Sequence, residues 1–411
     1  MSNLIADIAH NPLVGVEETL IILLVVAAAA AMLSRAVKLP YTVILVVVGL
    51  VIGLLRVVHN VHLSADVAFY VVLPVILFEG ALNTPARHLR RDWPLIALLA
   101  GPGIIVAFAL TALGAHWLGL AWAGAALFGA LISATDPVSV VALFRGLNAS
   151  ERLTTIVESE SMFNDGTAAV LFTIALATLP SAAGVSLGHA ALQFLWMLAG
   201  GLAVGAGVGY VAYRLHSRYD EAMLELLFTT IVAYGSFLAA QALHMSGPVA
   251  CATAGIVIGN VGRSRGMSEE VSGAVGVFWE YAAFLANSVV FVLIGLRIDL
   301  GGILGNAGLV IAAFSIVIVA RAVTVYSLGG VMSLTARRVP LAWLHVLTWG
   351  GVRGTVALAL VLSLPSDTPQ RATIEVLAFG VVLLSLLVQG LTIRPLVAWL
   401  RLTGSTETGD D

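Results

Sequence analysis

Long apolar runs separated by short polar breaks recur along the whole chain. Each run is about 17–30 residues long, and a helix needs roughly 20 residues to cross the hydrocarbon core of a bilayer. Such runs predict transmembrane helices, because a helix satisfies its own backbone polar groups. Thirteen spans are predicted, at about 15–33, 40–56, 64–84, 94–117, 121–144, 152–179, 187–213, 222–243, 247–261, 271–296, 304–333, 341–363 and 371–399.

The basic residues between the runs give the orientation of the spans. Taken alternately, one set of breaks holds only Arg56, Arg297 and Arg371. The other set is much richer and holds Arg35, Lys38, Arg87, Arg90, Arg91, Arg145, Arg152, Arg214, Arg218, Arg263, Arg265, Arg337, Arg338, Arg394 and Arg401. The positive-inside rule makes the second set cytoplasmic. We therefore expect a multi-pass protein of the cell (inner or plasma) membrane, with its N-terminus outside and its C-terminus in the cytoplasm.

Composition agrees with this class. Of the 411 residues, 60% are hydrophobic and 10% are charged, whereas soluble domains carry about 25% charged residues. The single cysteine, Cys251, lies in an apolar run, so no intramolecular disulfide is possible and we expect no redox role. We expect no cofactor, no nucleic-acid partner and no enzymatic activity, because the acids are not arranged with a nucleophile, a phosphate loop or a metal cluster.

Two of the predicted spans are interrupted. The fifth contains Ser133-Ala-Thr135-Asp136-Pro137, and Pro137 removes a helical N–H and disfavours helix at the preceding residue. The twelfth contains Gly350-Gly351-Val-Arg353-Gly354, whose glycines weaken the helix. The two spans have opposite predicted directions. Interrupted spans at corresponding places in two halves of a chain indicate an inverted-repeat transporter with a site near the midplane.

The two breaks carry opposite charges, Asp136 and Arg353. Where half-helices meet, paired N-terminal ends carry positive partial charge and paired C-terminal ends carry negative partial charge. We predict that Asp136 compensates the positive partial charge of the N-terminal ends. Arg353 is predicted to compensate the negative partial charge of the C-terminal ends.

A group of oxygen-bearing side chains is predicted near the same depth. Asp165 lies thirteen residues after Arg152, or roughly 20 Å along a helix. Ser161 is one turn before it, Asn164 is beside it, and Thr135 belongs to the broken fifth span. Together with freed carbonyl groups these residues suit a hard cation such as Na⁺.

Three further acids lie in or near the apolar runs. Glu79 lies toward the cytoplasmic end of its span and can complete the cation cage from that side. Glu158 is closer to the cytoplasm and is interpreted as a solvated acid of the approach to the site. Glu280, within Phe278-Trp279-Glu280-Tyr281, is predicted to be buried, and the sequence assigns it no partner.

Glu160 needs a counter-charge, and Arg321 and Arg353 are the two cations predicted near mid-membrane. One of them is expected to pair with it, and the sequence leaves open which. A paired carboxylate is poorly placed to exchange protons, which leaves Asp165 as the carrier. Burial disfavours the charged form of a carboxylate, so Na⁺ and H⁺ can compete for Asp165 near neutral pH.

At these residues the chain resembles monovalent cation–proton antiporters of the NhaP/NHE type (the CPA1 branch), in a prokaryotic version without a large cytoplasmic tail. The resemblance rests on motifs that occur in the family's order. They are Ser133-Ala-Thr-Asp-Pro-Val138, Glu160-Ser-Met-Phe-Asn-Asp165, Phe284-Leu-Ala-Asn-Ser-Val-Val-Phe291, Gly350-Gly-Val-Arg-Gly354 and Gln389-Gly-Leu-Thr392.

The resemblance implies an all-α, NhaA-like antiporter fold of about thirteen transmembrane helices, with inverted repeats whose broken helices cross near the midplane. It also implies a homodimer that works by an elevator movement. The corresponding division places ion-translocating core helices at about 64–179 and 304–399, scaffold and dimerisation helices at about 15–56 and 187–296, and a short polar cytoplasmic tail at 402–411.

The resemblance further implies exchange of Na⁺ (or Li⁺) for H⁺. Asp165 would bind Na⁺, with Ser161, Thr135 and Glu79 as further ligands, and Asn164 would steady the aspartate. An Asn-Asp pair goes with electroneutral one-for-one exchange in this family. K⁺/H⁺ or mixed Na⁺/K⁺ exchange remains an alternative, because sequence does not fix the size of the cage. A Na⁺-coupled symporter and a cation channel are less favoured, since neither a substrate pocket nor a filter loop is visible.

Overall fold

The computed structural model describes residues 12–37, 39–55, 67–147, 149–179, 186–216, 221–263, 267–333 and 339–402. Its regular elements in these ranges are helices, which confirms the predicted all-α class. Part of the predicted loop charge (Lys38, Arg56, Arg218, Arg265, Arg337 and Arg338) and residues 403–411 of the predicted tail lie outside the described residues.

The helices follow the predicted apolar runs in order, and elements labelled η are π-helical. The first part of the chain forms α2 (Pro12–Val37), α3 (Tyr41–Leu54), η1 (Ala68–Val72), α5 (Leu73–Leu82), α6 (Ala86–Leu98), η2 (Leu99–Gly103), α7 (Ile104–Trp117), α8 (Trp122–Ser133), α9 (Val138–Gly146) and α10 (Glu151–Ala177). The second part forms α11 (Leu187–His216), α12 (Ala222–Ala242), α13 (Gly247–Val257), η3 (Ile258–Gly262), α15 (Glu269–Arg297), α16 (Leu300–Gly305), α17 (Ala307–Ser333), α18 (Leu341–Trp349), α19 (Thr355–Leu362), α20 (Arg371–Leu384), η4 (Ser385–Gln389) and α21 (Gly390–Trp399).

Helix length and composition support a multi-pass membrane protein. Within the described ranges, six helical stretches are long and apolar enough to cross a membrane, namely Ala86–Trp117, Gly188–Leu215, Ala222–Ala242, Glu269–Arg297, Ala307–Ser333 and Arg371–Trp399. One boundary differs from the prediction. Arg87, Arg90 and Arg91 were expected in a loop, but α6 begins at Ala86 and carries all three on its first turns.

Small residues bring several helices into close backbone contact. A Cβ added at Gly201, Gly205 or Gly209 on α11 would lie 3.0, 2.2 and 2.9 Å from atoms of α13. On the same α13–η3 helix, a Cβ at Gly255 or Gly259 would lie 2.7 and 2.1 Å from atoms of α5. Glycines spaced four residues apart allow such approach between helices in a membrane. They therefore hold α11, α13 and α5 together.

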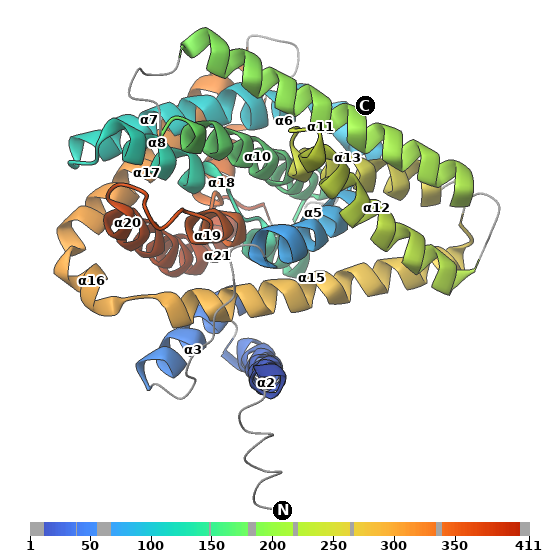
Figure 1. Ribbon diagram of the computed structural model, residues 1–411, viewed down its shortest axis with the longest axis horizontal. Helices are drawn as coiled ribbons and strands as arrows, with labels where there is room; N and C mark the ends of the chain where they lie inside the picture. The colour runs from blue at the N-terminus through green and yellow to red at the C-terminus, as the bar shows by residue number, and fades with distance from the viewer. Residues whose placement is uncertain are drawn as a thin grey trace, which may run out of the picture.

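A second close contact joins α3 to α15. A Cβ at Gly49 would lie 2.2 Å from the carbonyl oxygen of Val292, and one at Gly295 would lie 2.2 Å from that of Val46. Figure 1 shows α15 and α11 as long helices on opposite sides of the molecule, with α10 between them and with α2 and α3 beyond α15.

The remaining helices pack around α10 and α17. α10 contacts α6 and α8, α7 contacts α8 and α17, and α17 contacts α18 and α20. At one end of this group, Arg152 Nη2 lies 2.5 Å from Asp92 Oδ1. The same guanidinium lies 5.0 Å from the ring centroid of Trp343, so Arg152 connects α10, α6 and α18.

Candidate functional site

Both predicted helix breaks are present, and the two broken spans meet. α8 ends at Ser133 and α9 begins at Val138, while α18 ends at Trp349 and α19 begins at Thr355. The backbone N–H of Asp136 donates to the carbonyl of Val352 over 2.7 Å. One hydrogen bond thus joins the two irregular segments directly.

The carboxylate of Asp136 lies at the N-terminal ends of two half-helices. Its Oδ1 accepts from the backbone N–H of Val138, the first residue of α9, over 3.0 Å. Its Oδ2 accepts from the backbone N–H of Thr355, the first residue of α19, over 3.1 Å and from the Thr355 hydroxyl over 2.7 Å. A negative charge is stabilised at helix N-termini, where unpaired N–H groups carry positive partial charge.

Arg353 lies at the opposite kind of end. Its Nη1 donates to the carbonyls of Ser133 and Ala134 at the C-terminus of α8, over 2.6 and 3.0 Å. The C-terminus of α18 has its own donors, because Gln389 Nε2 donates to the carbonyl of Trp349 over 2.9 Å and Arg321 Nε donates to that of Leu347 over 3.2 Å. These contacts have the geometry expected for charge compensation at helix ends.

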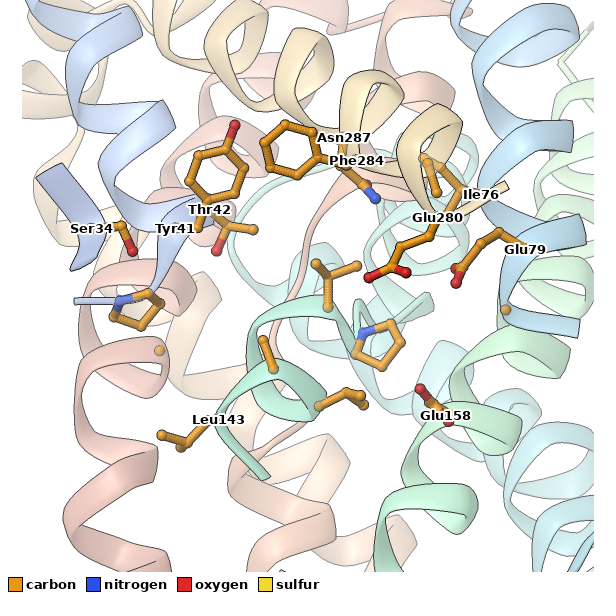
Figure 2. A pocket seen from close by; sticks show the side chains of 18 of the residues that line it. Ser34, Tyr41, Thr42, Ile76, Glu79, Leu143, Glu158, Glu280, Phe284 and Asn287 are labelled. Carbon is orange, nitrogen blue, oxygen red and sulfur yellow. The ribbon is translucent and has the colours of Figure 1, made fainter. Parts of the chain in front are cut away.

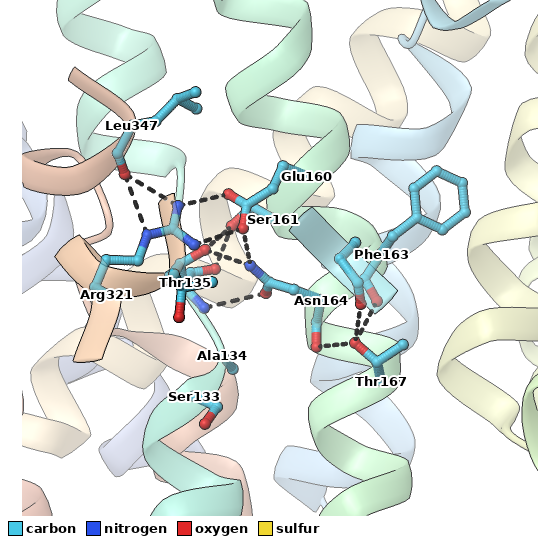
Figure 3. Close-up of polar contacts among 12 residues, drawn as sticks. Ser133, Ala134, Thr135, Glu160, Ser161, Phe163, Asn164, Thr167, Arg321 and Leu347 are labelled. Atoms are coloured by element: carbon cyan, nitrogen blue, oxygen red, sulfur yellow. Dashed lines mark hydrogen bonds and ion pairs between the residues drawn. The ribbon is translucent and has the colours of Figure 1, made fainter. Parts of the chain in front are cut away.

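Glu160 pairs with Arg321, which answers the question that the sequence left open. Arg321 Nη1 lies 2.8 Å from Glu160 Oε1, and Nη2 lies 3.0 Å from Oε2. Both residues are buried, and Figure 3 shows the guanidinium between this carboxylate and the carbonyl of Leu347. The pair is bidentate, the strong form of a charge-assisted contact.

The amide of Asn164 connects the fifth span to Glu160. Its Nδ2 donates to Thr135 Oγ1 over 2.7 Å and to Glu160 Oε1 over 2.9 Å, and its Oδ1 accepts from the backbone N–H of Thr135 over 3.1 Å. The resemblance suggested that Asn164 steadies Asp165. In the described part of the chain its amide hydrogen bonds go instead to Thr135 and Glu160, the groups within its reach (Figure 3).

Ser161 and Thr135 also bind one another. Their hydroxyl oxygens lie 2.9 Å apart, and the Ser161 hydroxyl also contacts the carbonyl of Thr135. Thr135 and Asp165 share the lining of a small cavity, together with Asp136 and Thr355. Two of the predicted cage residues, Asp165 and Thr135, are therefore brought together at one cavity. The third, Ser161, contacts Thr135.

Asp165 lies at the inner end of a larger cavity. The residue is only 6% exposed, and its Oδ1 is buried without a hydrogen-bond partner among the described residues. It shares with Glu79 and Glu158 the lining of a cavity of about 540 Å³. Ser34 and Arg394 also line this cavity, so it lies on the side that the charge pattern assigns to the cytoplasm.

Glu280 is where the sequence interpretation was wrong. It was predicted to be buried, but it is exposed and lines the same cavity. Figure 2 shows its carboxylate pointing into the cavity, as does that of Glu79. Glu280, Phe284 and Asn287 are spaced i, i+4 and i+7, so they share one face of α15. That spacing, next to the recognised motif beginning at Phe284, was a signal that could have found it.

Asn287 and Thr355 were also missed as contacts of the crossing. Asn287 lines the larger cavity, and its Oδ1 lies 3.4 Å from the hydroxyl of Thr355. Thr355 in turn donates to Asp136. Asn287 lay within a quoted motif, but only the packing of α15 against α19 shows what it contacts.

Comparison with known proteins identifies the family. The family described as sodium/hydrogen exchanger, transmembrane, matches residues 20–399. The Na⁺/H⁺ antiporter NhaG of Bacillus atrophaeus is 39% identical over 380 residues, which cover 89% of this chain and 71% of that protein. The Na⁺/H⁺ antiporter NhaP of Pseudomonas aeruginosa is 39% identical over 343 residues, which cover 79% of each.

A solved structure shares the fold. The sodium proton antiporter MjNhaP1 of Methanocaldococcus jannaschii, determined at pH 8, superimposes with a TM-score of 0.76 at 19% sequence identity, over 93% of this chain and 98% of that one. The chain therefore belongs to the sodium/hydrogen exchanger family and is a prokaryotic, NhaP-type member of its CPA1 branch.

Proposed function

We propose that this protein is a secondary antiporter that exchanges Na⁺ for H⁺ across the cell membrane. The observation that carries the proposal is Asp165, a buried carboxylate whose Oδ1 has no hydrogen-bond partner among the described residues and which lines a cavity together with Glu79, Glu158 and Glu280. A carboxylate in such a place is costly unless it binds a cation or a proton. Homologues named as Na⁺/H⁺ antiporters support this assignment.

The ligands that we assign to Na⁺ are the carboxylate of Asp165 with oxygens of Thr135, Ser161 and Glu79. Thr135 shares the small cavity with Asp165, and Glu79 shares the larger one. The Ser161 hydroxyl lies 2.9 Å from that of Thr135, which places its oxygen beside this ligand. Asn164 holds Thr135 in place through both ends of its amide. Hard oxygen ligands of this kind suit Na⁺ and Li⁺.

The proposed exchange is electroneutral, one cation for one proton. Asp136 is engaged at two helix N-termini, and Glu160 is engaged by Arg321. Of the three buried acids at the crossing, this leaves Asp165 to take up either Na⁺ or H⁺. Each carries one positive charge, so a cycle in which only loaded forms cross moves no net charge.

We further propose thirteen membrane spans arranged as inverted repeats, a homodimer, and an elevator-type movement of a core past a scaffold. The sequence-based division placed 64–84 in the core. We move α5 to the scaffold, because it packs mainly against α13 and α15. The core then comprises α6–α10 and α17–α21, and the scaffold comprises α2, α3, α5, α11, α12, α13 and α15. The N-terminus is assigned to the outside and the C-terminus to the cytoplasm.

The test is cation-driven proton movement in proteoliposomes that hold an imposed pH gradient. Na⁺, Li⁺ and K⁺ are added separately, with and without a clamped membrane potential. The wild-type protein should dissipate the gradient with Na⁺ and Li⁺, and rate and end-point should not depend on the potential. Asp165→Asn should reduce exchange to the background of empty liposomes, while Glu151→Gln, an exposed acid on the same helix, should retain it.

Three results would contradict the proposal. If added Na⁺ does not dissipate the pH gradient in wild-type proteoliposomes, Na⁺/H⁺ exchange is excluded. If Asp165→Asn retains full exchange, Asp165 is excluded as the carrier. A strong dependence of the end-point on membrane potential would exclude one-for-one stoichiometry.

A further inference from the structure

Glu280 takes no part in the helix crossing or in the proposed Na⁺ ligands. It lies on α15, and its exposed carboxylate points into the larger cavity, opposite α10 (Figure 2). Within the described part of the chain it makes no hydrogen bond or ion pair that would explain it as a structural residue. A charged group at such a position is a candidate for function.

The cavity that Glu280 faces is predominantly acidic. Glu79, Glu158, Asp165 and Glu280 line it, and Arg394 is the one basic side chain among its lining residues. Arg263 lies outside the lining and donates to Asn83 Oδ1, while Asn83 donates to Glu79 Oε1 over 2.7 Å. A cleft lined by one sign of charge within low-dielectric walls concentrates the opposite ion.

The cavity acids lie at graded depths. α10 and α15 both begin on the side assigned to the cytoplasm, at Glu151 and Glu269. At a rise of 1.5 Å per residue, Glu158 is roughly 10 Å, Glu280 roughly 16 Å and Asp165 roughly 21 Å along their helices. Glu280 is thus farther from the cytoplasmic start of its helix than Glu158 is from the start of α10, and less far than Asp165.

The cavity with this acidic lining also contains the group that we expect to bind the cation, the carboxylate of Asp165. Among the described residues Asp165 Oδ1 has no hydrogen-bond partner, and Asp165 lines the same cavity. Asn287, on the same face of α15 as Glu280, reaches Thr355 at the helix crossing. The Glu280 face of α15 thus leads from the open part of the cavity to the crossing.

We propose that Glu280 is a relay carboxylate, which attracts a hydrated monovalent cation into the cytoplasmic cavity before the cation reaches Asp165. The proposal rests on the proposed function and extends it to the path of approach. Glu280 acts by its charge at a distance from Asp165, and the cation keeps water ligands while it is there. Glu79, on the neighbouring helix α5, lines the same cavity and belongs to the proposed Na⁺ ligands.

Everted membrane vesicles test the proposal, because they expose the cytoplasmic face to added Na⁺. At low ionic strength, Glu280→Gln should raise the half-saturating Na⁺ concentration about two- to tenfold, as expected for loss of one nearby charge. The maximal exchange rate at saturating Na⁺ should change much less. Adding choline chloride should shrink the difference from wild type, because the Debye length is only about 10 Å at 0.1 M salt.

Two matched variants complete the design. Glu280→Asp keeps the charge and should restore a half-saturating concentration near that of wild type. Glu270→Gln removes an exposed acid from the first turn of the same helix, outside the cavity lining, and should behave as wild type. The thermal unfolding temperature in detergent is measured for each variant. If these temperatures are comparable, the differences in half-saturating Na⁺ concentration are due to charge.

The inference is overturned if Glu280→Gln matches wild type at low ionic strength. It is also overturned if the change persists unaltered in choline chloride, or if Glu280→Asp is as impaired as Glu280→Gln. These outcomes differ from failure of the proposed function, in which the wild-type vesicles themselves show no Na⁺-driven exchange.

Discussion

Three acids at the crossing, Asp136, Glu160 and Asp165, are similarly buried but have different neighbours. Asp136 accepts hydrogen bonds at two helix N-termini, and Glu160 is paired with a guanidinium. Asp165 Oδ1 has no hydrogen-bond partner in the described part of the chain. Since a buried charge must be paired or neutralised, only Asp165 of the three is left for an exchangeable cation or proton.

At the residue scale, Glu160→Gln should lower stability more than it alters cation affinity. Gln preserves the shape and can still accept from Asn164, but Arg321 then keeps a buried charge without its carboxylate. Breaking a buried pair in this way costs about 3–5 kcal/mol. We expect a lower unfolding temperature in detergent and less folded protein, with a nearly unchanged half-saturating Na⁺ concentration in the fraction that survives.

The Arg371–Glu375 pair provides the control, because it is a 2.7 Å ion pair at one-third exposure. Exposed pairs contribute about 0–1 kcal/mol, so Glu375→Gln should unfold near the wild-type temperature. If Glu160→Gln were fully stable but bound Na⁺ poorly, Glu160 would be a cation ligand instead of a structural partner.

At the scale of elements, the two broken spans are held by very close packing. An ideal Cβ at Gly354 would lie 2.0 Å from Asp136 Oδ2, the atom that accepts from Thr355 at the start of α19. The carboxylate can occupy the end of α19 only because Gly354 has no side chain. Gly354 therefore has two roles. It weakens the helix at the break, and it leaves room for the contact between the two broken spans.

Gly354→Ala should displace this carboxylate or the backbone around it. Strain of this kind costs roughly 1–3 kcal/mol, and we expect a lower unfolding temperature together with reduced Na⁺/H⁺ exchange. Gly235→Ala on α12 is the matched control, since a Cβ there meets no atom within 4 Å. It should be neutral or stabilising by up to about 1 kcal/mol. Normal stability and exchange in Gly354→Ala would show that the crossing tolerates a shifted carboxylate.

At the scale of the whole molecule, the proposed core and the proposed scaffold both contribute residues to the lining of the larger cavity. α10 and α21 contribute Asp165 and Arg394 from one group, and α5 and α15 contribute Glu79 and Glu280 from the other. An elevator movement would change the distance between these groups while each keeps its internal packing. A covalent link across the boundary should therefore stop transport, and a link within one group should not.

Val43 on α3 and Gly390 on α21 provide a link across the boundary. An ideal Cβ at Gly390 lies 3.5 Å from Val43 Cγ2, so the two positions are in side-chain contact and a pair of cysteines there can be tested for oxidation to a disulfide. In a Cys251→Ala background, oxidised Val43→Cys/Gly390→Cys should lose exchange and regain it on reduction, with both single variants active. For comparison, an ideal Cβ at Gly380 lies 3.4 Å from Val310 Cβ within the core, and oxidised Val310→Cys/Gly380→Cys should remain active. Full exchange by the oxidised Val43/Gly390 pair would contradict the elevator movement.

The sequence by itself determined the all-helical membrane class, both helix breaks and the residues near them. These features are local: an apolar run of about 20 residues partitions into a bilayer whatever surrounds it, and Pro137 or Gly350–Gly354 weakens its own helix. Charge alternation between the runs also predicts an orientation without tertiary contacts. The candidate carrier Asp165 followed from its depth and spacing along one helix.

Only the tertiary structure decided which groups meet. Glu160 and Arg321 are 161 residues apart in the chain, and the sequence offered Arg353 as an equal partner. Nor could the sequence predict the contacts of Asn164, the packing of α5 against α13 and α15, or the exposure of Glu280 to the cavity. Each depends on how helices distant in sequence pack through close contacts, such as that of Gly205 on α11 with Ala250 on α13, because burial and charge pairing are set by neighbours in space.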